Sequence, residues 1–281
     1  MATLGLKEPV QHNRLMTSTD QQNGADEAAV IEYEQPLNER LRTYLRLEFL
    51  YRQTQYHQQN SGPWATRAAV SSILEILAIT GRGDCRTDAL KELERQLAVL
   101  NEFRSKQGVD SERLHGIMTQ LAHHRGELNS IGGVFMQNLR DAEFLSAIRH
   151  RSAIPGGTCE FDLRDYFHWL NEPFTTRQEA FDDWMNHIRI LCEAVIYLLW
   201  VTRQNSRPRR ELAAGGNFQL NLDRDSHCQL VRITLPAGTE LFPEISGSHY
   251  RCSIRFLKWQ GVGARPIQAE QDVPFLLATC S

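Results

Sequence analysis

The spacing of apolar positions changes twice along this chain. Residues 30–34 alternate between apolar and polar side chains, which favours a strand that ends near Pro36. From Leu37 the apolar residues recur every four positions, through Leu41, Leu45 and Phe49, as on one face of a helix. The same spacing predicts further helices over residues 63–79, 87–103, 111–121, 135–148, 162–169 and 176–199. We expect Thr87, Asp162 and Thr176 to cap three of them.

Beyond Gln204 the helical spacing gives way to short alternating runs separated by Gly, Pro and Asn. These runs predict strands over residues 218–222, 229–235, 250–256 and 273–278. The fold class we predict is therefore α+β, with an all-helical domain over residues 30–204 and an antiparallel β domain over residues 205–281. The early strand, residues 30–35, could join the β domain. Residues 1–29 are polar and mixed, which indicates a flexible extension.

Composition narrows the class of protein. The net charge of −3 gives no overall attraction to nucleic acid or membrane, and no apolar run approaches the roughly 20 residues that span a bilayer. The six cysteines are scattered without a CxxC pair, which favours free thiols in a reducing cytosol. Nucleotide-binding loops, zinc-ligand spacings and nucleophile elbows are all absent from the sequence. We therefore predict a protein without an active site, metal or cofactor. The alternative is a hydrolase that uses His168 or His227 with nearby acids.

Two arginines stand four positions apart in the predicted strand over residues 250–256. Since strand side chains alternate between faces, Arg251 and Arg255 point the same way with Ser253 between them. Cys252, Ile254 and Phe256 point to the opposite face, toward a core. A solvated strand face is the ordinary interpretation of such a pattern, and a rigid basic stripe that binds an anionic partner is the sharper one.

Other arginines could belong to the same basic patch. Arg82 lies in a Gly-Arg-Gly loop, where functional residues are common, and Arg86 follows shortly after it. Arg207, Arg209 and Arg210 could enlarge the patch, although we favour a solvated linker. The cluster from Arg203 to Arg210 also allows an alternative, a nucleic-acid-binding protein. The acidic overall balance and the lack of a stacking motif count against it.

Several blocks of the sequence, taken in order, resemble the ZapD family of bacterial cell division proteins. They are residues 33–50, 86–96, 154–163, 243–247 and 251–256. The resemblance implies a homodimer that binds the C-terminal tail of FtsZ, crosslinks its filaments at the mid-cell ring in the cytoplasm, and uses no cofactor. It also implies that Arg82, Arg251 and Arg255 bind the tail. Arg86, Arg207 and Arg210 are further candidates from their positions in the sequence alone. It favours the basic stripe over the solvated face.

The helix that begins near Leu37 has apolar residues on more than one side. One face could pack inside the domain while another contacts a second subunit. We expect the dimer interface to include Leu41, Tyr44, Leu45 and Tyr51, with an all-core helix as the alternative.

Overall fold

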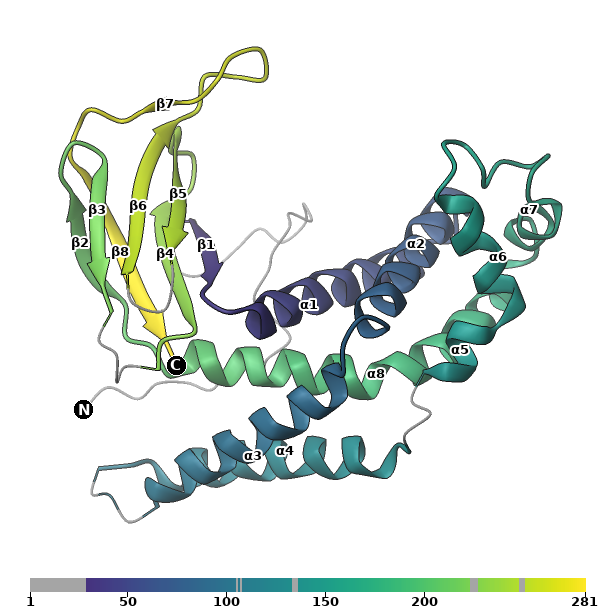
Figure 1. Cartoon of the computed structure of the whole chain (residues 1–281), viewed down its shortest axis with the longest axis horizontal. Helices are drawn as coiled ribbons and strands as arrows, with labels where there is room; N and C mark the ends of the chain where they lie inside the picture. Colours follow the sequence, from purple (N-terminus) through teal and green to yellow (C-terminus); the bar gives the residue numbers. More distant parts are fainter. Residues whose placement is uncertain (1–28, 105, 107, 133–135, 223–226, 248–250) are drawn as a thin grey trace, which may run out of the picture. The chain divides into compact units, whose positions relative to one another are not determined.

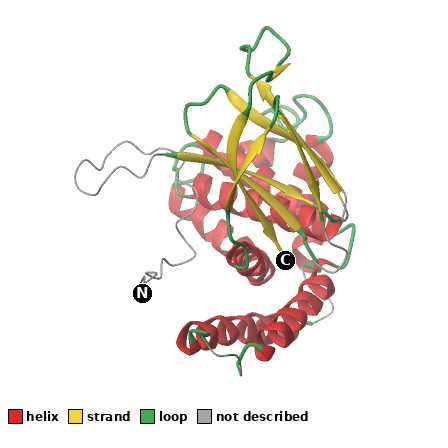
Figure 2. Ribbon diagram, turned by 90° about the vertical axis from the view of Figure 1, so that its left-hand side faces the viewer, coloured by secondary structure: helices red, strands yellow, loops and turns green. Residues whose placement is uncertain are grey.

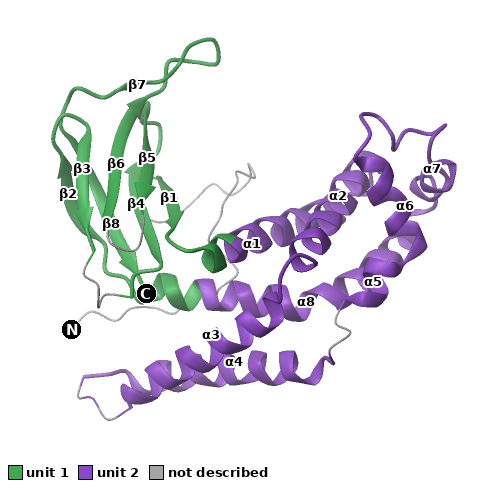
Figure 3. Cartoon of the chain, in the orientation of Figure 1, with its two compact units in different colours: residues 1–42, 200–281 green, residues 43–199 purple. Residues whose placement is uncertain are grey.

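The chain folds into two compact units. Its computed structural model describes residues 29–281 except 105, 107, 133–135, 223–226 and 248–250. Unit 1 comprises residues 1–42 and 200–281, and unit 2 comprises residues 43–199 (Figure 3). All described strands lie in unit 1 and helices α2 to α7 lie in unit 2 (Figures 1 and 2). The predicted α+β class is confirmed, whereas the predicted extension lies, apart from Ala29, outside the described residues.

Unit 2 is built from helices. The helices of the chain are α1 (Glu39–Gln58), α2 (Pro63–Thr80), α3 (Cys85–Glu102), α4 (Ser111–Ser130), α5 (Gln137–Asp141), α6 (Glu143–Ser152), α7 (Arg164–Leu170) and α8 (Phe174–Gln204). The long α8 supplies the fully buried Ile188, Leu191 and Val195. By length and composition alone α8 could cross a membrane, but 61% of its most apolar stretch is buried inside the protein. We therefore interpret α8 as a core helix.

Helix ends differ from the predictions in ways that local chemistry explains. Helix α3 is capped by Asp84, not Thr87, because the Asp84 carboxylate accepts the Thr87 backbone N–H at 3.0 Å. The single helix predicted over residues 135–148 is two helices, since Ala142 adopts an extended ψ of 117° between α5 and α6. Helix α7 begins after Leu163, whose side chain makes no cap, and Thr176 lies inside α8.

Unit 1 contains two antiparallel sheets. The strands are β1 (Val30–Pro36), β2 (Arg209–Ala213), β3 (Asn217–Asn221), β4 (Leu230–Pro236), β5 (Leu241–Gly247), β6 (Arg251–Lys258), β7 (Ile267–Gln268) and β8 (Val273–Cys280). Sheet A has the order β1-β4-β8-β2, and sheet B has the order β3-β6-β5 with β7 also paired to β6. The early strand does join the β domain, because β1 pairs with β4 along its whole length.

The two sheets share one apolar core. Val231 and Ile233 from sheet A and Ile254 and Phe256 from sheet B are all fully buried in the same cluster. Sheet B therefore turns one face inward to this core and leaves the other face outward. Strands β2, β5 and β7 were not predicted. Pro243 obscures β5, yet a proline is compatible with its position at the edge of sheet B.

Candidate functional site on the outer face of sheet B

Strand β6 positions the two arginines that the sequence singled out. Cys252, Ile254 and Phe256 are fully buried, while Arg251 and Arg255 are exposed. Because the faces alternate, the two arginines stand on the outer face of sheet B, one on each side of Ser253. Burial of the apolar set fixes the register of the strand and so fixes the face that carries the guanidinium groups.

Neighbouring strands surround these arginines with short polar side chains. On β3 the outward residues Asn217 and Asn221 lie directly opposite Arg255 and Arg251, and Gln219 lies opposite Ser253. The Gln219 amide donates to the Ser253 hydroxyl at 2.8 Å. Over the described residues of β3, this side of the face therefore offers hydrogen-bonding groups beside the two cations and no carboxylate.

An apolar pair continues the same face beyond Arg255. Phe242 on β5 lies opposite Leu257 on β6, and both side chains are half-buried. Leu257 is two residues after Arg255, so its side chain projects to the same face. Sequence reasoning missed this apolar end of the site because it did not find β5. Cations beside apolar surface suit a ligand that is partly acidic and partly apolar.

The two arginines differ in their partners. Arg255 forms an ion pair with Glu244, its direct neighbour across the strands, and its Nε lies 3.1 Å from Glu244 Oε2. The two side chains are 52% and 51% exposed. Within the described part of the chain, Arg251 pairs with no carboxylate. Among the described residues, Arg255 thus has an internal acidic partner and Arg251 has none.

A glycine allows β5 and β6 to approach closely beside the arginines. Gly247 lies opposite Cys252, and a Cβ at Gly247 would overlap the Cys252 sulfur atom. Any side chain at this position would push the end of β5 away from β6. Gly247 therefore helps to hold the strand that carries Glu244 and Phe242 against the strand that carries the arginines.

The remaining arginines proposed from the sequence are divided between the two units. Arg82 is exposed in the loop between α2 and α3 and belongs to unit 2, and no described carboxylate pairs with it. Arg86 is half-buried, and its Nε donates to the Leu128 carbonyl of α4 at 2.9 Å. That bond ties α3 to α4. Arg207 and Arg210 are exposed in unit 1, with Arg210 on β2.

Two of the four arginines in the proposed nucleic-acid cluster pair with internal carboxylates. Arg209 donates to Glu211 at 2.5 Å, and Arg203 forms two hydrogen bonds with Glu34. Arg209 and Arg210 are the first two residues of strand β2, so the prediction of a linker at these positions is wrong. The pairing of Arg203 and Arg209 with acids lowers the net positive potential that this segment offers to a phosphate backbone.

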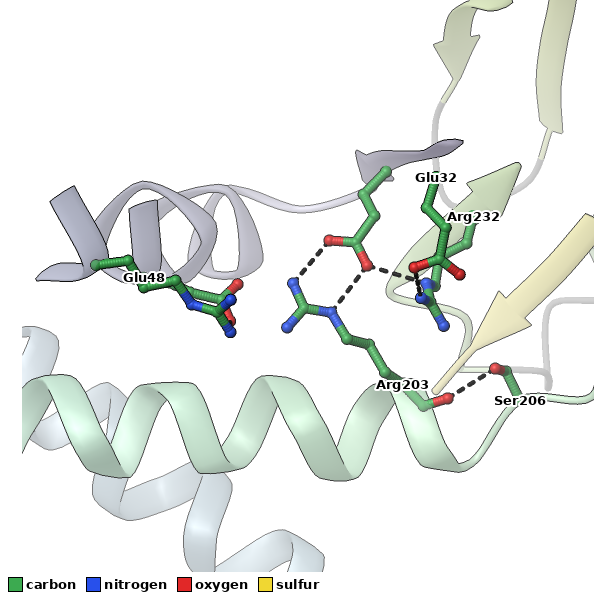
Figure 4. A network of polar contacts seen from close by, with 7 residues as sticks. Glu32, Glu48, Arg203, Ser206 and Arg232 are labelled. Carbon is green, nitrogen blue, oxygen red and sulfur yellow. Dashed lines mark hydrogen bonds and ion pairs between the residues drawn. The ribbon is translucent and has the colours of Figure 1, made fainter. Parts of the chain in front are cut away.

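Glu34 is held between two arginines in the interior of unit 1. Arg203, at the end of α8, contacts the Glu34 carboxylate at 2.7 and 2.8 Å, and Arg232 of β4 contacts it at 3.0 Å (Figure 4). Arg232 also reaches Glu32 at 2.6 Å. Burial raises the pKa of the Glu34 carboxyl, but the hydrogen bonds and charges of Arg203 and Arg232 outweigh it and hold that pKa below its usual range. This network anchors β1 in unit 1.

Helix α1 does not present the predicted dimer residues to solvent. Leu41, Tyr44 and Tyr51 are 2%, 1% and 3% exposed, so they are core side chains and offer no surface to a second subunit. Their positions form the helix face that packs inward. Leu45 is half-buried and stays a candidate, and on its side of the helix Phe49 and Tyr56 are 64% and 63% exposed.

Among the described residues, no group of three or more His, Cys, Asp or Glu side chains is placed to hold a metal ion.

Comparisons with known proteins decide the family. The family model described as ZapD, a cell division protein, matches residues 45–255. The chain belongs to the ZapD family of cell division proteins. The ZapD match extends from the middle of α1 to Arg255 and so includes Arg82, Arg251 and Arg255.

Relatives in three bacteria carry the name cell division protein ZapD. The relative in Dechloromonas aromatica is 38% identical over 252 residues, which cover 90% of this chain and 100% of the relative. The relative in Aromatoleum aromaticum is 36% identical, with 90% and 98% covered. The relative in Methylococcus capsulatus is 35% identical, with 89% and 98% covered. The ZapD family is one of cell division factors, not of enzymes.

Proposed function

We propose that this protein binds the C-terminal tail of FtsZ on the outer face of sheet B and, as a homodimer in the cytoplasm, tethers FtsZ filaments at the mid-cell ring. The observation that carries the proposal is the placement of Arg251 and Arg255 on one rigid face, with Phe242 and Leu257 at its end. Membership of the ZapD family supports the partner.

Arginine suits this task for a geometric reason. Its planar guanidinium donates two parallel hydrogen bonds to one carboxylate, and the strand backbone holds two such groups at a fixed spacing. The exposed Arg251 keeps this ability, and Arg255 holds only a half-exposed partner, Glu244, whereas Arg203 and Arg232 direct their donors at the largely buried Glu34. Arg82, from the loop after α2, is the third proposed contact, and Arg86, Arg207 and Arg210 are weaker candidates.

Dimerisation gives the bundling step its mechanism. Two tail sites on one particle can hold two filaments, and the many tails along each filament raise the effective concentration of the next contact. We propose that the outer face of α1 forms the dimer contact through Leu45, Phe49 and Tyr56, which lie at helical spacings of four and seven residues. Exposed aromatic residues of this kind are typical of subunit interfaces.

Co-sedimentation tests both parts of the proposal. The protein should pellet with FtsZ filaments, fail to pellet with filaments of FtsZ lacking its tail, and bundle only the former. The double variant Phe49→Ser, Tyr56→Ser should become a monomer by light scattering, keep its affinity for a tail peptide and lose bundling.

A matched control removes a different exposed apolar side chain. Val262 is 97% exposed in unit 1, so Val262→Ser should change neither the oligomeric state nor bundling. Bundling by the monomeric double variant would contradict the dimer mechanism. If as much of the protein pellets with tail-less filaments as with complete ones, the tail site is wrong.

A further inference from the structure

Glu244 occupies part of the site that the proposed function assigns to the partner's carboxylates. It stands directly opposite Arg255 in the register of β5 and β6. Both Nε and Nη2 of Arg255 point at the same oxygen of Glu244, Oε2. These two nitrogens form the edge of a guanidinium that matches a carboxylate in the two-bond geometry. An incoming carboxylate therefore meets an edge of Arg255 that is already occupied.

The ion pair between Arg255 and Glu244 can open at a small cost in free energy. Both side chains are half exposed, and exposed ion pairs of this kind are held by a small net free energy because water competes for both charges. At the same time, the strand register keeps Glu244 permanently beside Arg255, so Glu244 competes at a high effective concentration. Arg251 has no such competitor among the described residues.

We propose that Glu244 is an internal competitor for Arg255 that weakens the binding of a single anionic peptide. This inference rests on the proposed function and concerns the affinity of the same site. A peptide carboxylate must displace Glu244 to take the Nε–Nη2 edge of Arg255, so one tail is held more weakly and attachment relies more on several tails at once. Glu244 thus favours crowded, filament-borne tails over single soluble FtsZ subunits.

The test removes the charge of Glu244 while keeping its shape. A fluorescein-labelled peptide with the sequence of the FtsZ C-terminal tail is titrated with wild-type protein and with Glu244→Gln, and binding is followed by fluorescence anisotropy. The Glu244→Gln variant should bind the peptide about two- to five-fold more tightly, as the release of an exposed ion pair predicts. Thermal unfolding of each variant checks that the fold is unchanged.

Glu240 provides the matched control. It is another exposed glutamate beside β5, and it pairs with the β6 residue Lys258 at 3.1 Å, away from the arginines. Glu240→Gln makes the same change in net charge, so it should leave the peptide affinity within the error of the wild-type value. Tightening by Glu240→Gln equal to that by Glu244→Gln would mean a general charge effect and would overturn the proposal.

Arg255→Gln separates this inference from the proposed function. It should weaken peptide binding, and in its background Glu244→Gln should give no further tightening, because the competed group is gone. If Arg255→Gln leaves the affinity unchanged, the tail site itself is wrong. If Arg255→Gln weakens binding while Glu244→Gln weakens it too, Glu244 positions Arg255 for the ligand, and only the competitor role is overturned.

Discussion

Unit 1 uses arginine in two contrasting ways. Arg203 and Arg232 are partly buried around Glu34, and together they make four contacts of 3.0 Å or less to Glu34 and Glu32. Arg251 and Arg255 are exposed on the outer face of sheet B, and among the described residues only Arg255 pairs with a carboxylate, that of Glu244. The same side chain thus serves as a structural clamp in one place and as an available cation in the other.

The difference shows which arginines can bind a partner. A guanidinium whose donors are satisfied inside the fold would have to give up those bonds before it could bind an external carboxylate. A half-exposed guanidinium gives up little, because water already screens its internal pair. Burial and the number of internal acids, more than the density of arginines in the sequence, therefore separate the proposed binding face from the clamp.

The clamp consists of Arg203 and Arg232 around Glu34, and removal of Arg203 from it should have the largest effect on stability. Arg203→Met leaves the largely buried Glu34 with Arg232 alone, and we expect a loss of about 2–4 kcal/mol in the free energy of unfolding of unit 1. Chemical denaturation followed by circular dichroism measures this loss. Arg255→Met, the matched change on the outer face, should cost no more than about 1 kcal/mol. Equal losses for the two variants would refute the distinction between clamp and face.

Lowering the pH should weaken the clamp because it protonates Glu34. Because the pKa of Glu34 in the folded protein lies below its usual value, Glu34 contributes stability above pH about 4.3, and this contribution is lost as pH falls through the folded pKa. Glu34→Gln removes the titrating group. Its free energy of unfolding should therefore fall less steeply than that of the wild type below pH about 4.3. Denaturant unfolding at a series of pH values tests this, and identical slopes would contradict the prediction.

Local periodicity was sufficient to find most of the architecture. The alternation in residues 251–256 identified both the buried side and the arginine side of β6, because a buried face forces a period of two. The four-residue spacing found α1, but it could not say which of the two apolar faces of α1 lies inward. The structure assigns Leu41, Tyr44 and Tyr51 to the core and leaves Phe49 and Tyr56 outside.

Contacts between distant residues were beyond the reach of the sequence. Arg203 and Glu34 are 169 positions apart, and nothing local marks them as a pair. Glu244 was missed because Pro243 hides the strand that places it beside Arg255. The Arg203–Arg210 segment appeared as one basic cluster, yet two of its arginines face internal acids. Charge density in a sequence does not reveal how much of that charge the fold neutralises.

Arg251 and Arg255 together bind the FtsZ tail in the proposed function, and one binding measurement tests this role. Anisotropy titrations of a labelled tail peptide should show affinity at least about tenfold weaker for Arg251→Gln, Arg255→Gln than for wild type, as the loss of two charge-assisted contacts predicts. Arg104→Gln, at an exposed position after α3, is the control and should bind like wild type. A folded double variant that binds the peptide as tightly as Arg104→Gln would contradict the account.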